Sequence, residues 1–249
     1  MMRVLILGGS SEASVLARRI AERSDFAAIL SHAGRTMSPA QAPIAVRSGG
    51  FGGAEGLALY LESERIEAVV DATHPFAAQI SRNAAQACAQ TNIPLLGFSR
   101  PAWTPVEGDR WSEVPDMNAA VAALGEMPRT VFLTVGRLSL SAFESARQHR
   151  YVVRTIEEVD GAQRFSRVTL IRARGPFDAA QEENLMSREG VDVLVTKNSG
   201  GAASAGKLVA GRRLGLEVVM VQRPAPPGFP VVYDVTDVLD WLEAHRPPP

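Results

Sequence analysis

The sequence predicts an α/β fold of two Rossmann-like domains, each built on a doubly wound parallel sheet, with a cleft between them. Short apolar runs alternate with helical patterns along the chain, polar or glycine-rich turns follow these runs, and one proline-rich stretch near Arg100 interrupts the alternation. Repeated strand–helix units of this kind form parallel sheets that carry helices on both faces.

The first domain is expected over residues 1–100. Its strands are predicted from short apolar runs bounded by turn residues, and its helices from longer amphipathic segments between these runs. The expected strands are Val4–Leu7, Phe26–Leu30, Ile44–Val46, Ala68–Asp71 and Pro94–Phe98. The expected helices are Glu12–Arg23, about Ala54–Ser63, and a third from Pro75 through Gln90.

A second domain is expected over residues 101–249. The stretch RPAWTPVEGDRW has no clear period and is interpreted as the crossing between domains, after which the alternation resumes. Asp234 or Thr236 is expected to cap the closing helix. The expected strands are Thr130–Thr134, Tyr151–Arg154, Val168–Ile171, Val193–Thr196 and Glu217–Val221. The expected helices are Ser139–Gln148, Asp178–Arg188, Ala202–Arg213 and Asp234–His245.

The composition is that of a globular protein, with 46% hydrophobic and 21% charged residues among 249. A net charge of −1 gives no electrostatic reason to bind nucleic acid or an anionic membrane. The single cysteine, Cys88, is expected as a small buried apolar group, and no apolar run approaches the roughly 18 residues of a membrane span. We therefore expect a cytoplasmic protein for which no membrane, nucleic-acid or obligate protein partner is evident.

The turn after the first strand is a candidate diphosphate site. Gly8 and Gly9 allow the backbone to approach a phosphate closely, and the following helix begins with amides that attract an anion. The hydroxyls of Ser10 and Ser11 would add donors, and Glu12 completes the motif. Ser10 stands where GxGxxG has its second glycine, so a tight turn that binds nothing remains an alternative.

The end of the second strand favours NADP over NAD. NAD-binding folds usually place a carboxylate about 20 residues after the glycines to bond the ribose 2′-hydroxyl. The sequence here is SHAGR, so Ser31 and Arg35 would instead accept a 2′-phosphate. The alternative is that Arg35 is an ordinary surface charge.

The segment DATHPFA follows another strand end, where open α/β sheets bind ligands. Thr73 and His74 would face the ligand, and His74 would bond a nicotinamide amide or a carboxylate, act as an acid, or cap a helix. The four histidines lie far apart in the sequence and have no ligand spacing with the cysteine, so no metal site is predicted.

The segment TKNSGG in the second half also joins a strand to a helix, and it suits an anion or a carboxylate. Arg137 follows a further strand end, and Lys207 lies in the helix after TKNSGG; solvated helix-end charges are the alternative for each. The candidate cofactor-binding residues of this segment are Lys197, Asn198, Ser199 and Gly200.

The chain resembles the precorrin-6A reductase family of cobalamin biosynthesis. The resemblance rests on ILGGSSEA, SHAGR, GGFGG, DATHPFA, RPAW, TVGR, RGPF and TKNSGG, in this order from Leu5 to about Arg223. DATHPFA and TKNSGG on either side of RPxW are specific together. Ser10 departs from the pattern, since the family is expected to have threonine more often there, and both residues offer a hydroxyl.

The resemblance implies that NADPH reduces one double bond of the precorrin-6A macrocycle to give precorrin-6B. A polycarboxylate ring needs cationic partners and apolar walls, while the cofactor supplies the hydride. His74 is a candidate for the proton donor, and solvent is the alternative. The candidate substrate-binding residues are Arg100, Trp103, Arg137, Lys197 and Lys207.

Other classes of protein share the predicted fold. One is another NADP-dependent reductase of a large anionic substrate. A short-chain dehydrogenase would be such a reductase, but that class needs a lysine four residues after its catalytic tyrosine. A non-catalytic NADP-sensing protein would leave TKNSGG without a task, and a two-domain glycosyl- or methyltransferase would bind a different donor. At that spacing Tyr60, Tyr151 and Tyr233 are followed by Glu64, Thr155 and Asp237.

Overall fold

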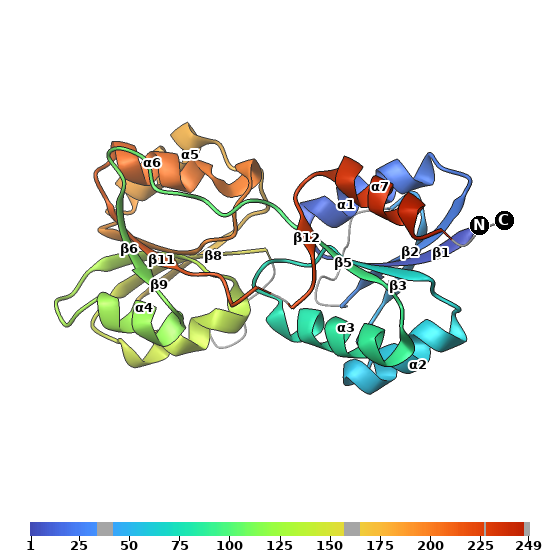
Figure 1. Cartoon of the computed structure of the whole chain (residues 1–249). Coiled ribbons are helices and arrows are strands. Elements are labelled where there is room, and N and C mark those ends of the chain that lie inside the picture. Colours follow the sequence, from blue (N-terminus) through green and yellow to red (C-terminus); the bar gives the residue numbers. More distant parts are fainter. Residues whose placement is uncertain (34–41, 157–164, 227, 247–249) are drawn as a thin grey trace. The chain divides into compact units, whose positions relative to one another are not determined.

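The computed structural model describes residues 1–33, 42–156, 165–226 and 228–246. The chain forms two compact units, one made of Met1–Pro101 with Pro224–Pro249 and the other of Ala102–Arg223 (Figure 1). Each unit holds a six-stranded sheet whose neighbouring strands pair in parallel. The prediction of two Rossmann-like α/β domains is confirmed, and the cleft between them stays a prediction.

The strands of the first unit are β1 (Met2–Leu7), β2 (Phe26–His32), β3 (Ala45–Ser48), β4 (Ala68–Asp71), β5 (Leu95–Phe98) and β12 (Val231–Val232). Its helices are α1 (Ser11–Ala21), α2 (Gly53–Ser63), α3 (Ala78–Thr91) and α7 (Val235–Ala244). Successive residues of β1 enter two different cores, Val4 and Ile6 on one face and Leu5 and Leu7 on the other. Helices α1 and α7 cover the first face, and α2 and α3 cover the second (Figure 1).

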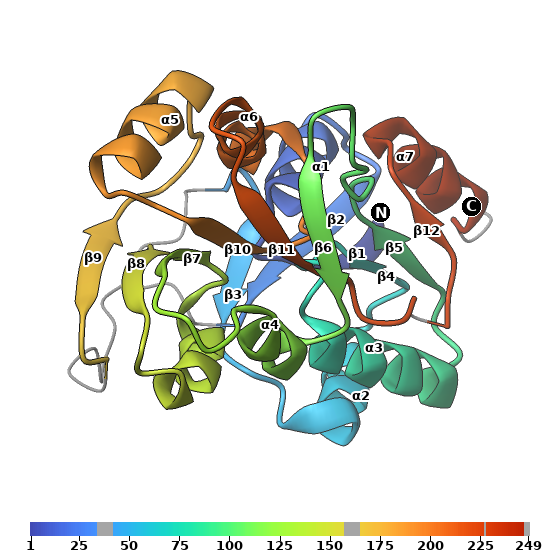
Figure 2. The same cartoon turned by 90° about the vertical axis from the view of Figure 1, so that its left-hand side faces the viewer.

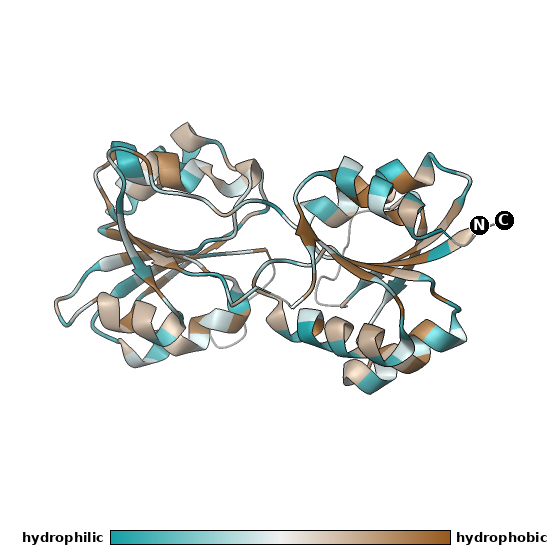
Figure 3. Ribbon diagram, in the orientation of Figure 1, coloured by the Kyte–Doolittle hydropathy of each residue, from teal (hydrophilic) through white to brown (hydrophobic). Residues whose placement is uncertain are grey.

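The strands of the second unit are β6 (Arg110–Val114), β7 (Thr130–Thr134), β8 (Arg150–Thr155), β9 (Val168–Arg172), β10 (Val193–Lys197) and β11 (Glu217–Val221). Its helices are α4 (Met117–Ala123), α5 (Ala179–Arg188), α6 (Gly206–Arg213), and the 3₁₀ helices η1 (Arg137–Ser145) and η3 (Ala202–Ser204). Helices α5 and α6 cover one face of the sheet and α4 the other (Figure 2). The hydrophobic strands lie at the centre of each unit, between helices with mixed polarity (Figure 3).

Both sheets reverse their strand order at one point. In the order β12-β5-β4-β1-β2-β3, the chain runs outward from β1 to β3 and then returns to β4 on the other side of β1. In the order β6-β11-β10-β7-β8-β9, the same reversal separates β7 from β10. Doubly wound sheets bind ligands outside the carboxyl ends of the strands at such a reversal. The turns after β1 and β4, and those after β7 and β10, are therefore the candidate sites.

The boundary of the second domain differs from the predicted range 101–249. Strand β12 pairs with β5 through Val231 and Val232, so the chain returns to the first sheet after Arg223. Helix α7 then packs beside α1 and buries Val238 and Leu242 in the core that the two helices share. The sequence pattern identifies a closing helix but does not show which sheet that helix will cover.

Several local predictions also need correction. Strands β6 and β12 and helix α4 were not predicted, and β6 begins inside the stretch that was interpreted as a crossing between domains. The third helix begins at Ala78 rather than at Pro75, and residues 202–213 form two helices with a break at Ala205. The predicted α-helix Ser139–Gln148 is instead η1, in which the Ser145 hydroxyl donates to the Ala142 carbonyl at 3.3 Å.

Helix α7 begins at the predicted cap, because the Asp234 carboxylate accepts the N–H of Thr236 at 2.7 Å. Within the described residues, no helix combines the length and apolar character needed to cross a membrane.

Because α7 completes the first core, we expect Leu242→Ala to lower the free energy of unfolding by about 2–5 kcal/mol. Leu242 is fully buried, whereas Leu59 on α2 is 67% exposed, so Leu59→Ala is a matched control that should change stability by no more than about 0.5 kcal/mol. Urea denaturation compares the two variants. Equal effects would contradict the assignment of α7 to the core.

Candidate functional site

The turn after β1 favours glycine at both of its positions. A Cβ on Gly8 would lie 2.6 Å from Leu30 Cδ1, and Gly9 has a φ of 116° that side chains rarely adopt. The N–H of Gly8 donates to the carbonyl of Ser31 at 2.9 Å, which ties the turn to the end of β2. The turn therefore delivers its backbone directly to the start of α1, as a phosphate-binding turn needs.

Ser10 joins the two turns of the first reversal point. Its hydroxyl accepts the N–H of Ala13 at 3.1 Å, which caps α1, and donates to the carbonyl of Ala72 at 2.6 Å. Because a hydroxyl has one proton, this bond leaves none for a phosphate. The Ser10 proton is thus engaged between the two turns, the predicted contact of its hydroxyl with a phosphate stays a prediction, and the first backbone amides of α1 are further donors.

Glu12 places a carboxylate in the first turn of α1, where it would oppose a bound anion. It forms an ion pair with Arg100 at 2.6 Å, and both side chains are 16% exposed. The hydroxyl of Ser11 also donates to Glu12, at 3.1 Å. Arg100 thus offsets an unfavourable charge at the candidate diphosphate site, and its predicted role in substrate binding stays a prediction.

Asp71 organises the turn after β4, and the sequence analysis did not single it out. One carboxylate oxygen accepts the N–H of Thr73 at 3.0 Å and its hydroxyl at 2.6 Å, while the other accepts the Ser81 hydroxyl at 2.5 Å. Asp71 is only 7% exposed. An acidic residue at the end of a buried apolar strand was the available signal. Thr73 is committed to this turn by the same bonds.

His74 lies in the irregular segment before α3. Its Nδ1 accepts the N–H of Phe76 at 3.2 Å, so the neutral ring carries its proton on Nε2. The ring lies 5.9 Å from that of Phe76 and is half-buried. The structure places His74 at the first reversal point, as predicted, but its role as a ligand contact or an acid stays a prediction.

Strand β2 ends at His32 without a carboxylate, and the preference for NADP over NAD that was predicted from this stays a prediction. Ser31 is 5% exposed, and its hydroxyl accepts a hydrogen bond from Arg47 at 2.7 Å. Arg35, the predicted partner of a 2′-phosphate, lies outside the described residues. Arg47 is a cation at this place that the sequence analysis missed.

The second reversal point carries two of the predicted cations. Lys197 ends β10 and is half-buried, and burial lowers the pKa of its ammonium group. Arg137 begins η1 and is exposed, after Gly136 with a φ of 80°. The Thr134 hydroxyl donates to the carbonyl of Val195 at 3.3 Å, across the reversal point. Both cations thus lie at the carboxyl ends of the central strands.

Asn198 and Trp103 fasten the chain that enters the second unit. The Asn198 side chain accepts the backbone N–H of Trp103 at 2.8 Å and donates to its carbonyl at 2.9 Å. The Trp103 indole donates to the carbonyl of Gly201 at 3.1 Å. Arg223, also missed, donates to the carbonyls of Asn198 and Ser199 at 2.9 and 3.1 Å. The TKNSGG segment thus holds neighbouring segments of the second unit through hydrogen bonds, and it is also a candidate site.

Lys207 is buried rather than presented on the surface. It is 4% exposed, and its ammonium nitrogen lies 5.1 Å from the centre of the Trp103 ring. This geometry supports the position of Trp103, and the predicted contacts of both residues with a substrate stay predictions.

The end of β8, which corresponds to that of β2 in the topology, is filled by the protein itself. Arg154 is 7% exposed and forms an ion pair with Glu182, which is 3% exposed. The guanidinium carbon of Arg154 also lies 3.6 Å from the centre of the Phe177 ring. A nucleotide ribose would meet these side chains at this position. The described residues at the end of β8 therefore differ from those at the end of β2 in charge and in packing.

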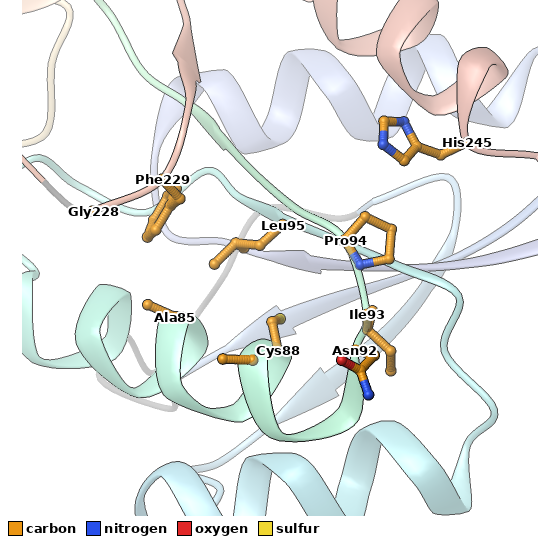
Figure 4. Close-up of a pocket in the computed structure, with 10 residues that line it drawn as sticks. Ala85, Cys88, Asn92, Ile93, Pro94, Leu95, Gly228, Phe229 and His245 are labelled. Atoms are coloured by element: carbon orange, nitrogen blue, oxygen red, sulfur yellow. The ribbon is translucent and has the colours of Figure 1, made fainter.

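A shallow apolar pocket of about 480 Å³ lies between α3 and the segment before β12 (Figure 4). Its lining includes Cys88, Leu95 and Phe229, and Leu95 begins β5, at the amino edge of the sheet. Burial raises the pKa of the Cys88 thiol to about 12, so the thiol stays protonated near neutral pH. Cys88 is a buried apolar group, as predicted, and this pocket is separate from the strand ends that form the candidate site.

The fold and its strand-end turns define the class of this protein. It is a two-domain, Rossmann-like α/β protein in which the first unit has a glycine turn suited to a diphosphate, and the second has cations at the corresponding strand ends.

Residues 3–243 match the family described as Precorrin-6x reductase CbiJ/CobK, and the chain belongs to this family. The chain is 45% identical over 249 residues to the precorrin-6A reductase of Rhodobacter capsulatus, with 100% of this chain and 99% of the relative covered. It is 47% identical over 243 residues to that of a Sinorhizobium species, with 98% and 93% covered. A solved structure of CobK precorrin-6A reductase has a TM-score of 0.93 at 45% identity and covers 98% of this chain and 97% of its own.

These comparisons confirm the resemblance that the motifs predicted. The chain is an oxidoreductase, and the predicted function as a reductase of cobalamin biosynthesis is supported. The likeness to the solved structure extends over both units, so the predicted fold class is confirmed independently of the sequence patterns.

The bond between Ser10 and Ala72 can be tested by two substitutions at one position. Ser10→Ala removes the helix cap and the bond between the turns, and we expect it to lower the free energy of unfolding by about 0.5–2 kcal/mol. Ser10→Thr retains a hydroxyl and should change stability much less. Urea denaturation measures both, and an equal loss in the two variants would show that the hydroxyl bonds are not responsible.

Proposed function

We propose that this protein uses NADPH to reduce one double bond of the precorrin-6A macrocycle, giving precorrin-6B. The observation that carries the proposal is identity of 45–47% over essentially the whole chain to relatives named precorrin-6A reductase. In enzyme-class terms the reaction acts on a CH–CH bond with NADP as acceptor in the reverse direction. The enzyme would need no partner beyond its small-molecule substrate and cofactor.

The residues of the first unit fit a dinucleotide. A Cβ on Gly8 would displace the Leu30 side chain, Gly9 has a positive φ, and the amides of Ser11 and Glu12 have no acceptor within α1, so this turn would hold the diphosphate. The paired carboxylate of Glu12 does not present an uncompensated charge to it. When bound, the cofactor supplies the hydride, and the protein binds and orients the two reactants.

The second unit fits the substrate better than a second nucleotide. The buried Arg154–Glu182 pair occupies the position at the end of β8 that a ribose would need. Lys197 and Arg137 at the central strand ends would meet the carboxylates of an acidic macrocycle. Lys197, Asn198, Ser199 and Gly200 were also predicted to contact the cofactor. The Asn198 side chain is bonded to Trp103, its N–H to the Val221 carbonyl and its carbonyl to Arg223, so Asn198 would contact a cofactor only by exchanging one of these bonds.

His74 is the proposed proton donor. Its Nδ1 accepts the N–H of Phe76, so Nε2 is the ring nitrogen that would hold the transferred proton, at the strand ends that would hold the nicotinamide end of the cofactor. The tyrosine-based alternative gains no support, because burial raises the pKa of Tyr151 to about 12 and its hydroxyl donates to the carbonyl of Ala146 at 2.8 Å. That hydroxyl is part of the core.

Anaerobic incubation with precorrin-6A tests the proposal. We expect NADPH to be consumed in a one-to-one ratio with the macrocycle, with a change in the tetrapyrrole absorption that depends on the enzyme. NADH at the same concentration is the control for cofactor preference. Binding of NADPH without turnover would instead support a sensing protein, and preference for a nucleotide sugar or an adenosyl donor would support a transferase.

Lys197 gives this proposal a pH dependence. Because burial lowers its pKa, the ammonium loses its proton at a lower pH than an ordinary lysine, and its attraction for a carboxylate should weaken as the pH rises through that value. Lys197→Ala should raise the KM for the macrocycle roughly 10- to 100-fold near neutral pH. Lys197→Arg keeps its charge, so its KM should stay level at alkaline pH where that of the wild type rises. Parallel pH profiles for all three would contradict a role for this charge.

A further inference from the structure

Arg47 lies beside the end of β2. It is the third residue of β3, and its Cα pairs with that of Ser31 in the parallel register. Ser31 in turn accepts the N–H of Gly8 through its carbonyl, so a chain of bonds runs from the glycine turn to Arg47. In Rossmann-like sheets the adenosine ribose of a dinucleotide lies at this strand end. Arg47 is therefore next to the position where the 2′-substituent of that ribose would be.

The guanidinium group of Arg47 is held in one orientation. One terminal nitrogen, Nη1, donates to the Ser31 hydroxyl at 2.7 Å and to the Gly49 carbonyl at 3.1 Å, and Nη2 donates to the Gly50 carbonyl at 3.3 Å. The guanidinium carbon lies 3.9 Å from the centre of the Phe51 ring and 4.9 Å from that of Tyr60. An arginine fixed by an aromatic face and by backbone carbonyls loses little conformational freedom when it binds a ligand.

The charge and the donors of Arg47 suit a phosphate. Among the described contacts, those three bonds engage three of its five N–H donors, which leaves two for a ligand. Within the part of the chain that the structure describes, no carboxylate lies within 4.0 Å of the guanidinium, and the side chain is only partly buried. Neighbouring Ser31 gives a small polar wall where an NAD-specific fold would have an acid.

We propose that Arg47, held flat against Phe51 at the end of β2, recognises the 2′-phosphate of the cofactor and sets the preference for NADPH over NADH. This inference rests on the proposed function, because it assumes that the dinucleotide occupies the first unit. It adds a specificity-determining residue that the motif SHAGR did not indicate. The phosphate would bond the outer edge of the guanidinium, while the inner edge stays on Ser31 and the Gly49 carbonyl.

A second role for Arg47 has to be separated from this one. Its bonds to the Gly49 and Gly50 carbonyls hold the glycine turn before α2, so its removal could loosen the whole adenosine end. A loosened turn would lower the affinity for every adenine nucleotide by the same factor. Loss of phosphate recognition would lower the affinity only for nucleotides that carry the 2′-phosphate. The test compares these two outcomes.

The experiment is a calorimetric titration of the full-length protein with 2′,5′-ADP and with 5′-AMP, two fragments of the adenosine end that differ by the 2′-phosphate. For Arg47→Ala we expect the affinity for 2′,5′-ADP to fall roughly 10- to 100-fold, and that for 5′-AMP to change less than about threefold. The same variant should lose NADPH affinity but retain NADH affinity. Arg47→Lys keeps a charge without the planar fork, so an intermediate loss is expected, and it serves also if the alanine variant does not fold.

Arg18→Ala is the matched control. Arg18 lies in the last turn of α1, at the end of the helix away from the glycine turn, and it is exposed. Its removal takes one positive charge from the same unit and should leave both affinities unchanged.

If Arg47→Ala lost affinity equally for 2′,5′-ADP and 5′-AMP, or for neither, the inference would be overturned while the proposed reaction stayed intact. A wild-type protein that reduces precorrin-6A with NADH as well as with NADPH would also overturn it alone. A wild-type protein that binds neither NADPH nor 2′,5′-ADP would overturn the proposed cofactor, and the inference with it.

Discussion

The candidate site of the first unit depends on one hydrogen bond between the turns that follow the neighbouring strands β1 and β4. The Ser10 hydroxyl makes this bond. It caps α1 and bonds the carbonyl of Ala72, so two turns that lie about sixty residues apart in the chain are held as one surface. Asp71 then fixes the second turn from within, through Thr73 and Ser81. A rigid pair of turns at the reversal point would allow the backbone amides of the proposed cofactor site to bind a phosphate without first being ordered.

The second unit has the same topology but a different use of its strand ends. In its TKNSGG segment, the Asn198 side chain is bonded to Trp103, and two backbone carbonyls accept hydrogen bonds from Arg223. The Arg154–Glu182 pair lies at the end of β8. Two units with one fold thus differ in which strand ends remain available. This asymmetry supports the proposed placement of nucleotide and macrocycle in different units, and it arises from buried side chains rather than from the strand order.

The strongly apolar strands and the glycine turns were predictable from the sequence, because burial on both faces leaves an uninterrupted apolar run and a positive φ favours glycine. Strand β6 was missed because RWSEV is an exposed, polar edge strand, and β12 because two valines form no recognisable run. The positions of Gly8, His74 and Lys197 at strand ends followed from the pattern. The partners of Asn198 and Ser10 did not, since a side chain's hydrogen bonds depend on segments distant in the sequence, and Arg47 became visible only through the pairing of β3 with β2.

The return of the chain to the first sheet has a consequence for biosynthesis on the ribosome. Residues 1–101 emerge first, yet β5 remains an unpaired edge and the face of α1 stays partly uncovered until residues 224–249 have been made. The nascent first unit must wait while the whole second unit is translated, and an open strand edge is the kind of surface that pairs with other chains. Synthesis therefore finishes the second unit earlier than the first, although the first is begun before it.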